Sequence, residues 1–159
     1  MTLRGDSMDN STAETNKELV QAYYEAWEVG DPQRLAELFA EDFSKVHHDS
    51  NGEQVTVAKS PGEDEVPLVE WFGGFVEGFP DKTFEIHDIV SEGDVVMTRI
   101  TATERMETEF LGIQPTGEYF DIHEFQSFRI QDGKIVEFHS VGDMLDVIEQ
   151  LGAELEIKQ

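Results

Sequence analysis

Hydrophobic and polar residues alternate along residues 116–141, TGEYFDIHEFQSFRIQDGKIVEFHSV, and this alternation predicts two β-strands. Asp132-Gly133 lies between the two runs. A tight type I′ hairpin turn favours this dipeptide, because the turn needs a positive φ that glycine adopts without steric cost. The sequence therefore predicts an antiparallel hairpin that turns at residues 132–133.

The first strand of this hairpin has two mixed faces, whereas a half-buried strand normally separates apolar from polar residues. Two interpretations stay open: the strand belongs to a curved sheet that lines a partly polar pocket, or it is a large edge strand with polar ends. One face carries Phe120, Ile122, Glu124, Gln126 and Phe128, and the other carries Tyr119, Asp121, His123, Phe125, Ser127 and Arg129.

Helical spacing of apolar residues marks the N-terminal part of the chain. Residues 15–29 are predicted to form a helix that begins with a capping box at Thr15 and Glu18. Asp31 and Pro32 begin a second helix, as a cap followed by proline at the first helical position. Residues 1–14 are polar and without period, and are expected to be a disordered lead-in.

The rest of the chain alternates short β units with helices. A small hairpin is predicted over residues 43–58 with its turn at Asn51-Gly52, and a third helix runs from Pro67 to about Glu77. Strands at 83–90 and 94–106 precede the long hairpin, and Asp143 caps a final helix that ends before a tail at 153–159. Strands gathered after the first helices predict an α+β fold with an antiparallel sheet.

Composition narrows the class of protein. The 159 residues suit one domain, and the absence of cysteine excludes disulfides and thiolate metal sites. The net charge of −24 repels nucleic acid and anionic lipid, so neither is expected as a partner. No segment has the length of a membrane span or the order of a signal peptide, which predicts a cytoplasmic protein. Acidic residues spread along the whole chain are typical of proteins from a high-salt cytoplasm.

Candidate chemistry lies mainly on the long hairpin. Glu124 and Gln126 are the best paired polar groups, because a carboxylate in an apolar pocket gains a raised pKa and serves as an acid or base. Among the five histidines, His48 and His139 are expected near a pocket, and no spacing supports a metal site. Arg99 lies alone in an apolar strand and needs a partner, either Glu124 or a purely structural one.

Three stretches carry a family resemblance: YYEAWEVGDPQRLAELFAEDF, FPDKTFEIHDIVSEGDVVMTRITAT and EFLGIQPTGEYFDIHEFQSFRIQDGKIVEFHSVGDMLDVIEQLG. Together they resemble the SnoaL-like polyketide cyclases (ester cyclases) of the nuclear transport factor 2-like superfamily. The resemblance implies a cone-shaped α+β domain over residues 15–152, with three N-terminal helices, a curved antiparallel sheet and a short C-terminal helix. It also implies a cofactor-free aldol ring closure of a polyketide ester, in which a carbon next to carbonyls loses a proton and attacks a second carbonyl.

The sequence departs from the family pattern at the residues that carry the family's chemistry. The acid/base aspartate of the family falls on Ser140, and the histidine that assists it falls on Gln126. The neighbouring pocket amide falls on Glu124, the pocket aromatic of the first helix on Trp27, and the histidine of a T-H-x-G stretch on Met106. The resemblance therefore transfers the fold and the pocket, but not the cyclase mechanism.

The sequence predicts a SnoaL-like enzyme that performs acid/base chemistry, without cofactor or metal, on an apolar carbonyl-bearing small molecule. The alternative is a non-catalytic module of the same fold that binds a ligand or forms a dimer. A homodimer through the outer sheet face, or a higher homo-oligomer, is expected. Glu124 is the predicted base, with Gln126 and His139 as hydrogen-bonding partners. The predicted pocket residues are Tyr24, Trp27, His48, Arg99, Phe120, Phe128 and Ser140.

Overall fold

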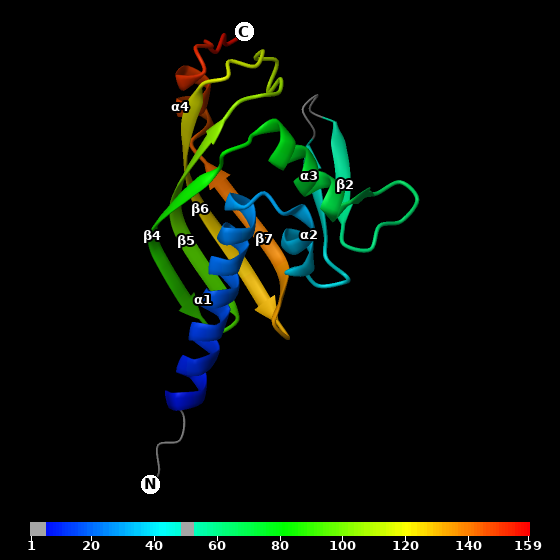
Figure 1. Ribbon diagram of the computed structural model, residues 1–159, viewed down its shortest axis with the longest axis vertical. Helices are drawn as coiled ribbons and strands as arrows, with labels where there is room; N and C mark the ends of the chain where they lie inside the picture. Colours follow the sequence, from blue (N-terminus) through cyan, green and yellow to red (C-terminus); the bar gives the residue numbers. More distant parts are fainter. Residues whose placement is uncertain (1–5, 49–52) are drawn as a thin grey trace.

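The computed structural model describes residues 6–48 and 53–159. These residues form four helices and seven strands, and the strands belong to two sheets (Figure 1). They are α1 (Asp6–Glu28), α2 (Pro32–Glu37), β1 (Ser44–His48), β2 (Gln54–Ala58), β3 (Val66–Pro67), α3 (Leu68–Gly78), β4 (Thr83–Glu92), β5 (Val95–Arg105), β6 (Tyr119–Gln131), β7 (Lys134–Gly142) and α4 (Met144–Gln150). The predicted α+β class is confirmed.

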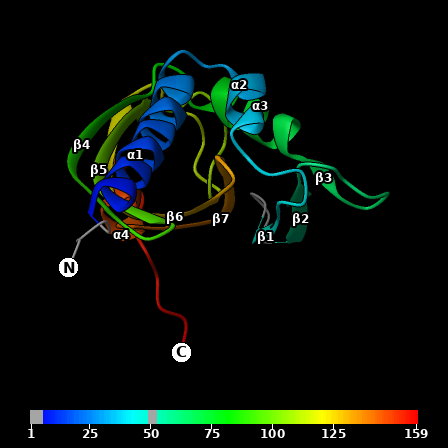
Figure 2. The same cartoon turned by 90° about the horizontal axis from the view of Figure 1, so that it is seen from below.

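A curved four-stranded antiparallel sheet, in the order β4-β5-β6-β7, forms the frame of the molecule. Its concave face wraps around α1, which packs against β4 and β5 (Figures 1 and 2). Helices α2 and α3 pack on each other beside α1, and α3 also contacts the small sheet β1-β2-β3. The sheet and the helices therefore enclose the space between them from opposite sides.

Strand β6 lies between β5 and β7, so the interpretation as an edge strand is wrong. Its face with Phe120, Glu124, Gln126 and Phe128 is the inner face, whereas Phe125 on the other face is 62% exposed. The mixed pattern arises because the inner face of a central strand is partly core and partly cavity wall.

The predicted turn of the long hairpin is confirmed. Asp132 has a φ of 51° and Gly133 a φ of 70°, so both central residues adopt the left-handed conformation that a type I′ turn requires. The side-chain caps predicted at Asp31 and Asp143 are present as well: Asp31 accepts from the Arg34 amide and Asp143 from the Asp146 amide.

The predicted start of the first helix is wrong. Helix α1 begins at Asp6, so residues 6–14 are helical and not a disordered lead-in, while residues 1–5 lie outside the described part. The Thr15 hydroxyl donates to the Ser11 carbonyl at 2.9 Å, a bond made within a continuing helix and not at its cap. The predicted turn at Asn51-Gly52 also lies outside the described residues.

Two hydrophobic clusters fill the molecule. The larger lies between α1, α2, α3 and the sheet and contains Tyr23, Tyr24, Trp27, Phe72 and Phe128. The smaller joins Phe79, Met106 and Phe120 to Val147 and Leu151, at the end of the sheet where α4 docks. None of the helices in the described residues is long and apolar enough to cross a membrane.

Candidate active site

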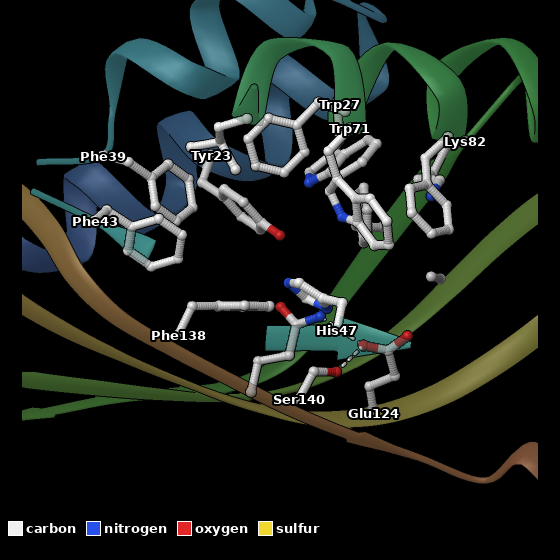
Figure 3. Close-up of a pocket in the computed structure, with 16 residues that line it drawn as sticks. Tyr23, Trp27, Phe39, Phe43, His47, Trp71, Lys82, Glu124, Phe138 and Ser140 are labelled. Atoms are coloured by element: carbon white, nitrogen blue, oxygen red, sulfur yellow. Dashed lines mark hydrogen bonds between the residues drawn. The ribbon is translucent and has the colours of Figure 1, made fainter. Parts of the chain in front are cut away.

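A cavity of about 230 Å³ lies between the inner face of the sheet and the helices α1 and α3 (Figure 3). Most of its wall is aromatic, and its polar groups come from strands. The lining residues are Tyr23, Trp27, Phe39, Phe43, His47, Leu68, Trp71, Phe72, Phe75, Lys82, Phe84, Ala102, Glu124, Gln126, Phe138 and Ser140.

Glu124 enters this cavity from β6 with one carboxylate oxygen held in place. Gln126 and Ser140 are direct partners across β6 and β7, and both donate to Glu124 Oε2, from Nε2 at 2.5 Å and from Oγ at 2.7 Å. Among the described residues, no hydrogen bond engages the other oxygen, Oε1. The carboxylate therefore has one anchored oxygen and one that is available to a ligand.

A chain of buried hydrogen bonds fixes the Gln126 amide. The Tyr24 hydroxyl donates to Gln126 Oε1 at 2.8 Å and lies 2.6 Å from the Thr98 hydroxyl. Because the one proton of Tyr24 goes to Gln126, Thr98 is the donor to Tyr24. Burial raises the pKa of Tyr24, so the hydroxyl stays protonated and Gln126 keeps its NH₂ group toward Glu124.

A buried ion pair borders the same cavity. Lys82 Nζ lies 2.9 Å from Glu104 Oε2, and the two side chains are 11% and 6% exposed. Lys82 Nζ also lies 4.4 Å from the centre of the Trp27 ring, within the range of a cation–π contact. Burial raises the pKa of Glu104, against the lowering effect of the Lys82 charge.

His47 of β1 lines the cavity and packs against Trp71, with ring centroids 4.7 Å apart and ring planes tilted by 31°. Burial lowers the pKa of His47 to about 4, and the nearby charge of Lys45 adds to the effect. The imidazole is therefore neutral near pH 7. His48 is also predicted at the pocket, but its side chain lies outside the described residues.

The structure brings four predicted residues together at the cavity: Glu124, Gln126, Ser140 and Trp27. Tyr24 lies behind Gln126 as its hydrogen-bond partner. Phe128 is fully buried in the larger cluster and Phe120 in the smaller one, so both are core residues and not cavity walls.

Two predicted residues lie on the outer face of the sheet, which corrects their assignment to the pocket. His139 is exposed because it alternates with Phe138 and Ser140 along β7, and these two line the cavity. Arg99 pairs with Asp88 at 2.7 Å, so the suggested pair of Arg99 with Glu124 is wrong and the structural alternative holds.

Sequence reasoning missed Lys82, His47 and Glu104. One signal was available: Glu104 occupies an inward position of β5, in series with the buried Val96, Thr98, Ile100 and Ala102. A carboxylate at such a position requires a cation nearby. No group of three or more His, Cys, Asp or Glu side chains in the described residues is arranged to hold a metal ion.

The sequence pattern of the SnoaL-like polyketide cyclases matches residues 17–151, which is most of the chain. The chain belongs to the SnoaL-like polyketide cyclase family. Its fold is that of the nuclear transport factor 2-like proteins, so the fold implied by the resemblance is confirmed.

Solved structures agree with this membership. The chain is similar to AclR, a candidate hydroxylase from Streptomyces galilaeus, with 29% identity, a TM-score of 0.70, and coverage of 92% of this chain and 91% of AclR. It is also similar to IdmH, a candidate polyketide cyclase from Streptomyces antibioticus, with 31% identity, a TM-score of 0.62, and coverage of 87% and 99%. An LEH-like epoxide hydrolase from M. tuberculosis shares the fold at 14% identity, a TM-score of 0.63, and coverage of 88% of this chain and 91% of the hydrolase. Among curated proteins, none matches this chain.

Proposed function

We propose that this SnoaL-like protein is an enzyme that moves a proton at a carbon next to a carbonyl group, on an apolar small molecule, without a cofactor. Glu124 is the base. The observation that carries the proposal is its carboxylate in an aromatic cavity, with Oε2 held by two neutral donors and Oε1 without a hydrogen bond to any of the described residues.

The two donors make the carboxylate a positioned base. Two hydrogen bonds to one oxygen of a carboxylate fix the direction of its other oxygen. Catalysis by a general base depends on such positioning, because the proton must lie within hydrogen-bond reach in the bound state. Tyr24 and Thr98 extend the support into the buried core.

The departures from the family fit this assignment. Ser140 and Gln126 stand where the resemblance implies an aspartate and a histidine, and both donate to Glu124. The acid/base group of this chain therefore lies on β6, whereas the resemblance implies one on the neighbouring strand β7. These contacts support a role in proton transfer on a related substrate. This role does not require the aldol ring closure that the family resemblance implies.

The test uses 2-acetylnaphthalene in deuterium oxide, with exchange of its methyl protons followed by mass spectrometry. The natural protein is expected to accelerate exchange over buffer, and Glu124→Gln to lower the rate by about 10²–10⁴-fold. Glu85→Gln is the matched control, because this carboxylate is 76% exposed on the outer face and should leave the rate unchanged. Equal rates for the natural protein and Glu124→Gln contradict the assignment.

The second candidate is a binding module without catalysis, and the serine at position 140 favours it because the family's acid/base carboxylate is missing there. Tight binding of the ketone with no exchange above that of buffer supports this candidate.

We also propose that the chain forms a homodimer through the outer sheet face and works in a high-salt cytoplasm. Apolar side chains on neighbouring strands of this face support the dimer, and the net charge of −24 supports the habitat. Sedimentation of Phe125→Asp against the natural protein tests the dimer, and an unchanged mass for the variant contradicts this interface. The exposed apolar residues are Val90, Met97, Phe125 and Val141.

A further inference from the structure

Lys82 is a buried cation that opens on the cavity across from Glu124. Among the described residues that line the cavity, Lys82 is the one lysine or arginine. Its side chain is 11% exposed. In Figure 3, Lys82 enters from the side of the helices and Glu124 from the opposite sheet, and both lie at the same end of the cavity. Phe39, Phe43 and Phe138 lie at the other end.

The contacts of Lys82 leave part of its ammonium group for a ligand. Glu104 Oε2 accepts at 2.9 Å, and the face of Trp27 covers a second side at 4.4 Å. An ammonium group has three N–H donors, so a carboxylate and a ring face do not use all of them. Glu104 holds the ammonium group in place among the aromatic side chains of the cavity.

We propose that Lys82 donates a hydrogen bond to the carbonyl oxygen of the substrate, and that the cavity selects neutral, enolisable ketones or esters with an aromatic body. This inference rests on the proposed function and names its substrate class. Lys82 and Glu124 would contact the two ends of one reacting unit, the carbonyl oxygen and the carbon beside it. The aromatic body would occupy the end with Phe39, Phe43 and Phe138.

The proton transfer then moves charge toward Lys82. Glu124 Oε1 takes the proton, the C–H electron pair forms a carbon–carbon double bond, and the carbonyl π pair moves onto oxygen. A carboxylate and a neutral ketone become a carboxylic acid and an enolate, so the total charge of the cavity does not change. A preorganised cation beside the new oxyanion stabilises the transition state more than the ground state.

The same charges disfavour an anionic substrate. Glu104 already balances Lys82, and Glu124 adds a negative charge to the cavity. The negative charge of Glu124 also contributes to raising the pKa of Glu104. A substrate carboxylate would add a further negative charge to a protein of net charge −24. A neutral carbonyl group gains the hydrogen bond without this repulsion.

The test compares 2-acetylnaphthalene with 2-ethylnaphthalene, which has a similar shape but no oxygen, by equilibrium dialysis. The natural protein is expected to bind the ketone at least about tenfold more tightly than the hydrocarbon. Replacement of the whole pair, Lys82→Met with Glu104→Met, should bring this ratio close to one and lower deuterium exchange by about 10²–10³-fold. Removing both charges avoids a buried unpaired carboxylate, so the double variant should fold.

Lys17→Met with Glu14→Met removes an ion pair on the exposed side of α1, so it is the matched control and should retain the preference for the ketone. Glu124→Gln should abolish exchange and also retain the preference. A preference that survives in the double variant, or no preference in the natural protein, overturns the role of Lys82. No exchange by the natural protein, with a preference that disappears in the double variant, overturns the proposed reaction while it supports carbonyl recognition by Lys82.

Discussion

Glu124 is supported by Gln126 and Ser140, two side chains that do not ionise near neutral pH. The natural protein should therefore show little or no aldol cyclase activity on polyketide esters. Ser140→Asp with Gln126→His restores the family pattern, but it also sets a second carboxylate beside Glu124, and like charges at this distance share a proton. We expect the triple variant that adds Glu124→Gln to gain measurable cyclisation.

The gain should lie within the range of about 10²–10⁴-fold that a general base contributes, measured as ring-closed product against time. Ser140→Ala is the control and should show no gain. Efficient cyclisation by the natural protein that persists in Glu124→Gln would place the chemistry on other residues.

Tyr24 acts on Glu124 through Gln126, so it is a positioning residue. Tyr24→Phe leaves Gln126 Oε1 and the Thr98 hydroxyl without their buried partner, which should lower the free energy of unfolding by about 1–3 kcal/mol. Deuterium exchange should fall as well, because the amide loses its fixed direction. Tyr119→Phe is the control, since its hydroxyl is on the outer face and 3.4 Å from Asp81. A Tyr24→Phe variant with normal exchange would remove Tyr24 from the site.

His47 makes the stability depend on pH in a defined window. Its pKa is about 4 in the folded protein, below the ordinary value of 6.5, so the unfolded chain binds more protons between these two values. The contribution of the neutral His47 side chain to the free energy of unfolding is fully present above about pH 6.5 and is lost as the pH falls to about 4.

His47→Gln should therefore lose less free energy of unfolding over this window than the natural protein does. After allowance for solvent screening of a half-buried group, the difference is on the order of 1 kcal/mol. Urea titrations at both ends of the window measure it, with the exposed His139→Gln as control. Identical losses in His47→Gln and the natural protein would contradict the assigned pKa.

At the scale of elements, the hairpin β6-β7 depends on its turn. Gly133 has a φ of 70°, so Gly133→Val should cost about 1 kcal/mol or more through strain of the left-handed backbone. Gly73→Ala in α3 is the matched control, because an added Cβ meets no atom within 4 Å there and alanine favours the helix. A Gly133→Val variant that melts with the natural protein would disprove the type I′ assignment.

Local signals predicted the elements well. Asp132-Gly133, the cap at Asp31 and the cap at Asp143 depend on residues within four positions of each other, and all three are present. The start of α1 was predicted wrongly because Thr15 also makes a good cap, and residues 6–14 continue the helix without an apolar period.

The site depends on contacts that local patterns do not contain. Glu124 and Gln126 were found because they share one face of one strand. Lys82 was missed because its partner Glu104 lies on another strand, and Tyr24 was placed in the wall because its bond to Gln126 spans 102 positions. Alternation along a strand shows which residues share a face, but not which of the two faces is turned toward the core. The packing of α1 on the sheet decides that, so Arg99 and His139 were assigned to the wrong face.

At the scale of the whole molecule, the acidic surface should make stability depend on salt. The net charge is −24, and the described arginines already pair with carboxylates, for example Arg129 with Asp94 and Glu137. Most acidic residues therefore repel one another, and salt screens this repulsion. The melting temperature should rise steeply from low to molar KCl. A flat profile would contradict the inference of a high-salt cytoplasm.

The proposed reaction requires that Glu124 meets the carbon beside a carbonyl group inside the cavity. A crystal structure of the protein with 2-acetylnaphthalene tests this directly. We predict the methyl carbon at about 3–3.5 Å from Glu124 Oε1, the distance of a reactive approach, with the carbonyl oxygen in hydrogen-bond contact with Lys82 Nζ. The ring system should lie among Phe39, Phe43 and Phe138. A ketone bound with its carbonyl group at that aromatic end, away from Glu124, would contradict both the base and the recognition of its substrate.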